Sequence, residues 1–270
     1  MVNGESTGEG QMVIRRIREH VATHNWFAVG IDFLIVVAGI VIGTQVNNWN
    51  QARIERKQGD EYRERLLADL QSNDAHNQNR RSYWQDVRRH AQAALSGPRN
   101  GPDNDAAFLV DAYQASQILT SQSRRFTYDE LISTGRLEHL GGPELRNQVA
   151  GYYVSPQAYG TVLNAIPAYR EFLRQEMPTA AQQAVRTQCA EIFFPGPDGS
   201  PFNRLPDKCS LNLAPAVSAE AITAVRSAPG VVEHLNRVIA DLDVKLAVLT
   251  AMDEQSRQLQ KQITEASSNS

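Results

Sequence analysis

The chain has 270 residues, of which 21% are charged, and a formal net charge of −3. Its lysines and arginines are interspersed with aspartates and glutamates instead of forming a basic stripe, which argues against nucleic acid as a partner. The length allows one membrane-spanning segment and about 220 further residues, enough for one domain with its own hydrophobic core.

The most informative segment is an almost unbroken apolar run over residues 26–46. A helix rises about 1.5 Å per residue, so a run of this length crosses a bilayer core of roughly 30 Å. Trp26 and Trp49 bracket the run as interfacial aromatic residues do, and residues 33–41 carry no polar stripe. We therefore predict a transmembrane helix over residues 26–48, an uncleaved signal anchor in the lipid bilayer. The alternative is a core helix of a soluble domain.

One face of this predicted helix carries an acid and two glycines. Asp32, Gly39, Gly43 and Asn50 follow one another at helical spacings and share this face. A carboxylate inside a bilayer costs about 2.5 to 3.5 kcal/mol on insertion scales, so Asp32 needs protonation, water or a partner. Glycines allow a second backbone to approach closely. We predict a helix interface with a second copy of the chain or with another membrane protein. Proton conduction would need further polar residues that this helix lacks.

The segment before the span bears on orientation. Residues 1–10 are rich in Gly, Ser and Glu, and residues 11–25 place Arg15, Arg16 and Arg18 opposite an apolar face. This basic amphipathic pattern is typical of a helix on anionic lipid, so we place residues 1–25 in the cytoplasm. Positive charges alone give a tie, because Arg53 and Lys57 follow the span as closely.

The two cysteines break the tie. Cys189 and Cys209 flank a turn-rich stretch at residues 194–201. A pair that closes such a loop is typical of a disulfide formed in an oxidising compartment. We therefore predict a Cys189–Cys209 disulfide and an extracytoplasmic helical domain over residues 49–270. Two unpaired thiols are the alternative.

Beyond the span, apolar residues recur at helical spacing and no stretch alternates as a strand does. We expect the membrane helix to continue as a stalk until the Gly and Pro residues at 96–102, with a kink or a solvated segment at residues 72–81. Further helices are predicted over residues 105–120, 126–135, 142–153, 155–186 with interruptions at Pro167 and Pro178, from 218, and over 231–264. This pattern indicates an all-α fold, in which one N-terminal transmembrane helix continues into an antiparallel helical bundle.

The short helix at residues 126–135 is the best candidate for a functional pocket. Thr127 and Glu130 have the spacing of a capping box, and Gly135 suits the C-terminal turn. A possible pocket around this turn would be lined by Tyr128, Asp129, Glu130 and Arg136. Capping and surface ion pairs explain the same residues equally well.

No motif marks a catalytic centre. The six histidines are dispersed, and only His20 and His24 share helical spacing. Beside a membrane we interpret these two as interfacial polar residues and not as metal ligands. The chain has no serine-centred elbow, phosphate-binding glycine loop, zinc motif or Cys-x-x-Cys pair. We therefore predict no catalytic residues, no metal site and no cofactor.

Two segments resemble a bacterial family. The first runs from Asp32 through the apolar span to Gln45-Val-Asn-Asn-Trp-Asn50, and the second covers residues 127–138, followed by Pro143-Glu-Leu-Arg146 and Tyr152-Tyr153. Both are similar to motifs of DUF6090, a family of membrane proteins without an established reaction. The loop between the two cysteines is not part of that pattern. The resemblance implies a single-pass bacterial membrane protein.

The sequence leaves two functions open. The first is a non-enzymatic protein, anchored in the inner membrane, that presents a helical periplasmic domain and acts as a sensor, scaffold or accessory subunit through protein–protein contacts. The alternative is a membrane-anchored periplasmic enzyme or small-ligand-binding module. The alternative requires a concave site with convergent polar groups in the helical domain.

Overall fold

The computed structural model describes residues 26–96, 102–120 and 122–268. The tail and the basic amphipathic segment predicted over residues 1–25 lie outside these described residues. The chain divides into two compact units, Met1–Lys57 and Gln58–Ser270. Helices dominate the described part, and its strands form one short hairpin, so the all-α prediction is confirmed.

The first described helix, α2, comprises Trp26–Leu95 and contains the apolar run. The most apolar stretch has a mean hydropathy of 1.7, and none of it is buried. Phe33 and Leu34, for example, are 69% and 66% exposed. Among the described residues, α2 is the one helix that is long and apolar enough to cross a membrane. Its apolar side chains are therefore exposed and form no part of the core of the described chain.

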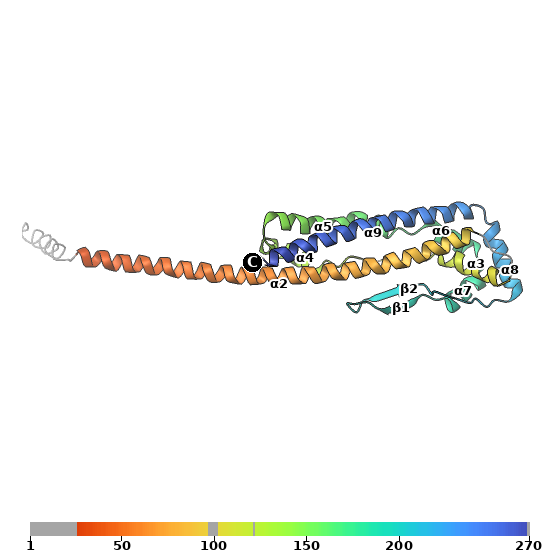
Figure 1. Ribbon diagram of the computed structural model, residues 1–270, viewed down its shortest axis with the longest axis horizontal. Coiled ribbons are helices and arrows are strands. Elements are labelled where there is room, and N and C mark those ends of the chain that lie inside the picture. The colour runs from red at the N-terminus through yellow and green to blue at the C-terminus, as the bar shows by residue number, and fades with distance from the viewer. Residues whose placement is uncertain (1–25, 97–101, 121, 269–270) are drawn as a thin grey trace, which may run out of the picture. The chain divides into compact units, whose positions relative to one another are not determined.

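In the second unit, α2 runs antiparallel to α9 (Val231–Ser268), as Figure 1 shows. Two contacts between them fix the direction. Arg63 Nε donates to Ser267 Oγ at 3.2 Å, and Arg88 Nε donates to Asp243 Oδ1 at 2.6 Å, so residue numbers rise along one helix as they fall along the other. Helix α5 (Pro143–Leu163) packs against α9. The predicted antiparallel helical bundle is confirmed.

Helix α2 is unbroken through residues 72–81, and the prediction of a solvated segment there is wrong. Ser72, Asn73, Asn77 and Arg80 are all buried. Asn73 Nδ2 donates to Arg124 O at 2.9 Å, and its Oδ1 accepts the Arg124 N–H at 2.6 Å. The polar patch therefore docks other segments to α2 instead of facing water.

The remaining helices are shorter. They are α3 (Pro102–Gln114), α4 (Phe126–Ser133), the 3-10 helix η1 (Leu137–Leu140), α6 (Ala168–Glu176), α7 (Thr179–Gln188) and α8 (Pro215–Ser227). Helix α3 ends at Gln114, earlier than the predicted Thr120, because the chain turns where Ser116 Oγ donates to Tyr113 O at 2.6 Å. A side-chain bond of this kind competes with continued helix.

Three prolines test the predicted helix boundaries. Pro167 and Pro178 directly precede α6 and α7, so both interruptions are confirmed. The predicted boundary at Pro156 is wrong, since α5 continues through it to Leu163. Buried Tyr153 and Leu163 anchor α5 on both sides of this proline, which compensates for the backbone hydrogen bond that a proline cannot donate.

Strands β1 (Ile192–Pro195) and β2 (Pro201–Arg204) pair antiparallel, with Phe194 opposite Phe202. The expectation of no strands is wrong at this place. Strands of four residues bounded by prolines are too short to show alternation in the sequence. The turn closes through Gly196 N–H, which donates to Ser200 O at 2.7 Å, and through Gly199 at φ +77°, a conformation that favours glycine.

Two hydrophobic clusters fill the second unit. The larger includes Trp84, Leu109, Leu173 and Leu249, and the smaller includes Leu66, Leu70, Leu131, Leu140 and Ile263. The smaller cluster packs α4 and η1 against α2, α5 and α9. It therefore positions the side chains that the sequence predicts as a possible pocket.

Candidate functional site

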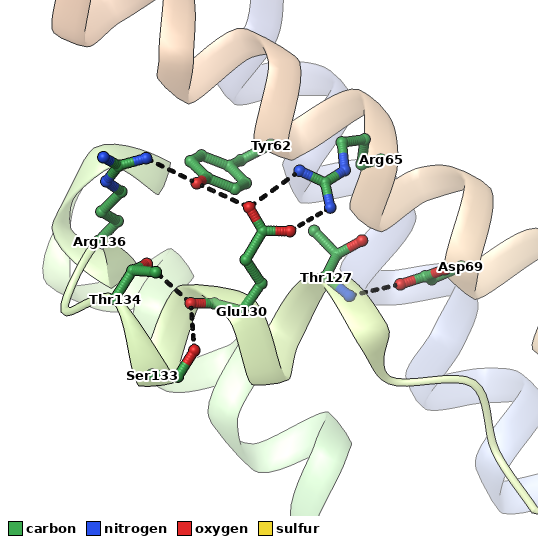
Figure 2. A network of polar contacts seen from close by, with 8 residues as sticks. All are labelled: Tyr62, Arg65, Asp69, Thr127, Glu130, Ser133, Thr134 and Arg136. Atoms are coloured by element: carbon green, nitrogen blue, oxygen red, sulfur yellow. Dashed lines mark hydrogen bonds and ion pairs between the residues drawn. The ribbon is translucent and has the colours of Figure 1, made fainter.

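Glu130 on α4 lies at the centre of a polar network with α2 (Figure 2). Its carboxylate accepts from Tyr62 Oη at 3.1 Å and from both terminal nitrogens of Arg65. Arg136 donates to Tyr62 Oη at 3.2 Å from the other side. The hydrogen bond from Arg65 lowers the pKa of Glu130, which is therefore an ionised carboxylate at neutral pH. The network fastens the short helix to α2, and its charges are partly exposed to water.

A side chain of α2 also caps the N-terminus of α4. Asp69 on α2 is buried, and its Oδ2 accepts the Thr127 N–H at 3.0 Å (Figure 2). The predicted capping box is wrong, because α4 has no side-chain cap of its own and Glu130 binds Arg65 instead. The C-terminal prediction holds: Gly135 has φ +67°, and Arg136 N–H donates to Leu131 O at 2.9 Å.

Tyr128 and Asp129 face a different neighbour. Arg125 Nε donates to both carboxylate oxygens of Asp129, at 2.8 and 2.9 Å. The ring of Tyr128 stacks on that of Tyr153 from α5, with centroids 4.6 Å apart. All four predicted residues therefore make structural contacts. Glu130 and Arg136 bind α2, Tyr128 packs on α5, and Asp129 pairs with Arg125 directly before α4. The ion-pair alternative accounts for Asp129, Glu130 and their partners.

A pocket of about 290 Å³, lined by both polar and apolar residues, lies beside this contact. Its polar lining includes Arg80, Ser123, Arg125, Tyr153, Gln157 and Asn164. None of the four predicted residues lines it, but Tyr128 and Asp129 contact two residues that do. The sequence does not mark it, because Arg80 and the ion-paired Arg81 both lack an acidic residue three or four positions away on their helix. The helical domain therefore contains a concave site with convergent polar groups.

The predicted face of the membrane helix is open in this single chain. A Cβ atom added at Gly39 or Gly43 would meet nothing within 4 Å. Asp32 and Asn50 are exposed as well. The face is available for a second helix.

The Cys189–Cys209 disulfide is present, with Cα atoms 5.5 Å apart. Cys189 follows α7 and is buried, and the bridge closes the loop that carries the hairpin. At the hairpin turn, Asp198 Oδ2 accepts from Ser72 Oγ at 2.7 Å and lies 3.3 Å from the Arg124 guanidinium. Hydrogen bonds from Ser200 and Ser72 hold the pKa of Asp198 well below its usual range. The loop is therefore fixed at its base by the disulfide and at its turn by the contacts of Asp198.

Ser200, His76 and Asp198 meet at the same turn, but their geometry is not that of a catalytic triad. Ser200 Oγ lies 3.0 Å from His76 Nε2, and Asp198 Oδ2 lies 3.5 Å from that same nitrogen. In a triad the carboxylate binds the opposite ring nitrogen, so that the imidazole can relay a proton. These contacts instead attach the hairpin turn to α2. No group of three or more His, Cys, Asp or Glu residues in the described part of the chain could hold a metal ion.

Comparison with protein-family models, with curated proteins and with solved structures finds no match for this chain. The resemblance to DUF6090 therefore stays a prediction that depends on its two motifs.

Proposed function

We propose that the chain is a non-enzymatic protein of the bacterial inner membrane that presents its helical unit, Gln58–Ser270, in the periplasm. Exposure of the apolar stretch of α2 carries the proposal. A row of side chains such as Phe33, Leu34 and Ile40, each more than 60% exposed, is unfavourable in water and favourable in lipid. The helical unit then acts as a sensor, scaffold or accessory subunit through protein–protein contacts.

Membrane fractionation tests the anchor. Attachment by a spanning helix resists high-salt and alkaline washes, because it does not depend on screened surface charge. A variant with Ile35→Lys and Ile40→Lys is the control, since each central lysine costs about 2.5 to 3.5 kcal/mol on insertion scales. We expect the parent in the washed membrane pellet and less of the variant there. Release of the parent by either wash would refute the anchor.

The periplasmic location is supported by the disulfide, which is typical of oxidising compartments. It also agrees with the basic segment before the span, which favours a cytoplasmic N-terminus. The Arg and Lys residues after the span are a weak objection, because large domains translocate despite flanking positive charge.

The open face of the span supports assembly through the membrane, with a second copy or another membrane protein. Gly39→Leu or Gly43→Leu would prevent close backbone approach, and Asp32→Leu would remove an intramembrane hydrogen-bonding group. Asp32→Asn keeps that capacity and is the matched control. Crosslinking in native membranes should show weaker adducts for the three Leu variants and milder loss for Asp32→Asn. Adducts like those of the parent for all four variants would refute this interface.

A second candidate function is a membrane-anchored small-ligand-binding module. The pocket beside α4 favours it, because binding modules require a concave site with convergent polar groups.

A further inference from the structure

Arg80 is a buried cation for which the described part of the chain provides no partner. The residue is 3% exposed, its Nε is sealed from solvent, and its guanidinium makes no hydrogen bond or ion pair with any residue that the structure describes. Burial lowers its pKa to about 10, so it remains charged at neutral pH. A buried charge that stays unpaired is strongly unfavourable, which points to a compensating group from outside the chain.

The fold can satisfy a buried guanidinium where it needs to. Arg63, on the same helix, is 4% exposed and donates to Leu140 O at 2.9 Å and to Ser267 Oγ at 3.2 Å. It also pairs with Asp60. Arg80 instead lines the 290 Å³ pocket. Tyr153, which lines the pocket too, has a buried hydroxyl without a hydrogen-bond partner in the described chain.

The charge inside the pocket is close to one positive unit. No carboxylate lines it among the described residues, and the second lining cation, Arg125, is already paired with Asp129. Lys245, a nearby cation, is not a lining residue, and its ammonium donates to Ala165 O at 2.8 Å. One negative charge therefore balances Arg80, whereas a phosphate dianion would bring one charge too many.

We propose that this pocket binds a small monocarboxylate whose carboxylate pairs with the Arg80 guanidinium. The planar fork of arginine matches a carboxylate through two parallel hydrogen bonds. Leu163 and Pro156 provide apolar wall for the carbon part of the ligand, and the volume suits a small molecule. The site does not depend on the membrane anchor or on the compartment.

Binding of sodium butyrate and sodium benzoate to the detergent-solubilised full chain tests the proposal. Saturation-transfer NMR gives Kd at constant ionic strength, with inorganic phosphate as the competing class of anion. The parent should bind at least one carboxylate saturably and more tightly than phosphate. Arg80→Met should raise Kd by roughly thirtyfold or more, because it removes one partner of a buried ion pair.

Arg81→Met is the matched control. Arg81 is the next residue on α2, pairs with Asp253 and does not line the pocket, so this variant should keep the parent Kd. Circular dichroism verifies that each variant is folded, and Arg80→Lys, which keeps the charge and loses the fork, gives a second weakened binder if Arg80→Met does not fold. Absence of saturable carboxylate binding by the parent, tighter binding of phosphate, or unchanged Kd in the Arg80 variants would overturn the proposal.

Discussion

Removal of the Cys189–Cys209 bridge, by Cys189→Ala with Cys209→Ala, should destabilise the helical unit by roughly 3 kcal/mol. The two cysteines are 20 positions apart, and closing a loop of about this length removes that much chain entropy from the unfolded state. For a unit of this size, each kcal/mol shifts Tm by about 2 to 4 °C, so Tm should fall by roughly 6 to 12 °C.

Thermal unfolding of the detergent-solubilised chain, followed by circular dichroism, measures this shift. Dithiothreitol should lower the Tm of the parent to near that of the double variant and leave the variant unchanged. The hairpin contacts at Asp198 and Ser72 do not involve the sulfur atoms, so the native helical signal should persist at low temperature. An equal Tm for parent and variant would refute the entropic reasoning. Two free thiols in parent protein alkylated at lysis would refute the disulfide itself.

Three further predictions concern the helical unit. Asp69→Ala should cost about 1 kcal/mol in urea unfolding because α4 loses its cap, and Asp69→Asn, which keeps an acceptor, should restore most of it. Leu131→Ala should cost about 3 kcal/mol in the same assay, since the side chain is fully buried in the smaller core; a loss below about 1 kcal/mol would contradict that packing. Burial raises the pKa of Tyr152 to about 12, so its contribution to stability is complete below pH of about 10 and is lost as the pH rises toward 12. Tyr152→Phe should flatten the fall of Tm in that window, and an unchanged slope would contradict the assignment.

The features that the sequence predicts correctly are those set by local patterns. The apolar run of α2 is recognised by its length, and the stops before α6 and α7 by prolines that cannot continue a helix. The disulfide is suggested by two cysteines around a turn-rich loop. In each case the deciding property belongs to residues close together in the sequence, or is the preference of a short segment for lipid over water.

The features that the sequence misses depend on partners far along the chain. Pro156 reads as a helix boundary, but tertiary packing carries α5 through it. The patch at residues 72–81 reads as solvated, yet Asn73 is buried against Arg124, a residue 51 positions away.

The sequence also misses the contacts of the candidate site, because they too involve partners far along the chain. Glu130 has the spacing of a capping residue, but its carboxylate binds Arg65 on α2. Asp69 caps the helix instead. The pocket at Arg80 forms only when the fold brings together residues of α2, of α5 and of the segment that precedes α4.

Fusion of a reporter after Ser270 tests the central claim most directly, because membrane anchoring and orientation must both be right. Alkaline phosphatase is active when its own disulfides form in the periplasm, and green fluorescent protein fluoresces when it folds in the cytoplasm. The proposed topology predicts an active phosphatase fusion and a dark fluorescent-protein fusion, both in the membrane fraction. A fluorescent fusion with an inactive phosphatase would place the helical unit in the cytoplasm and contradict the account.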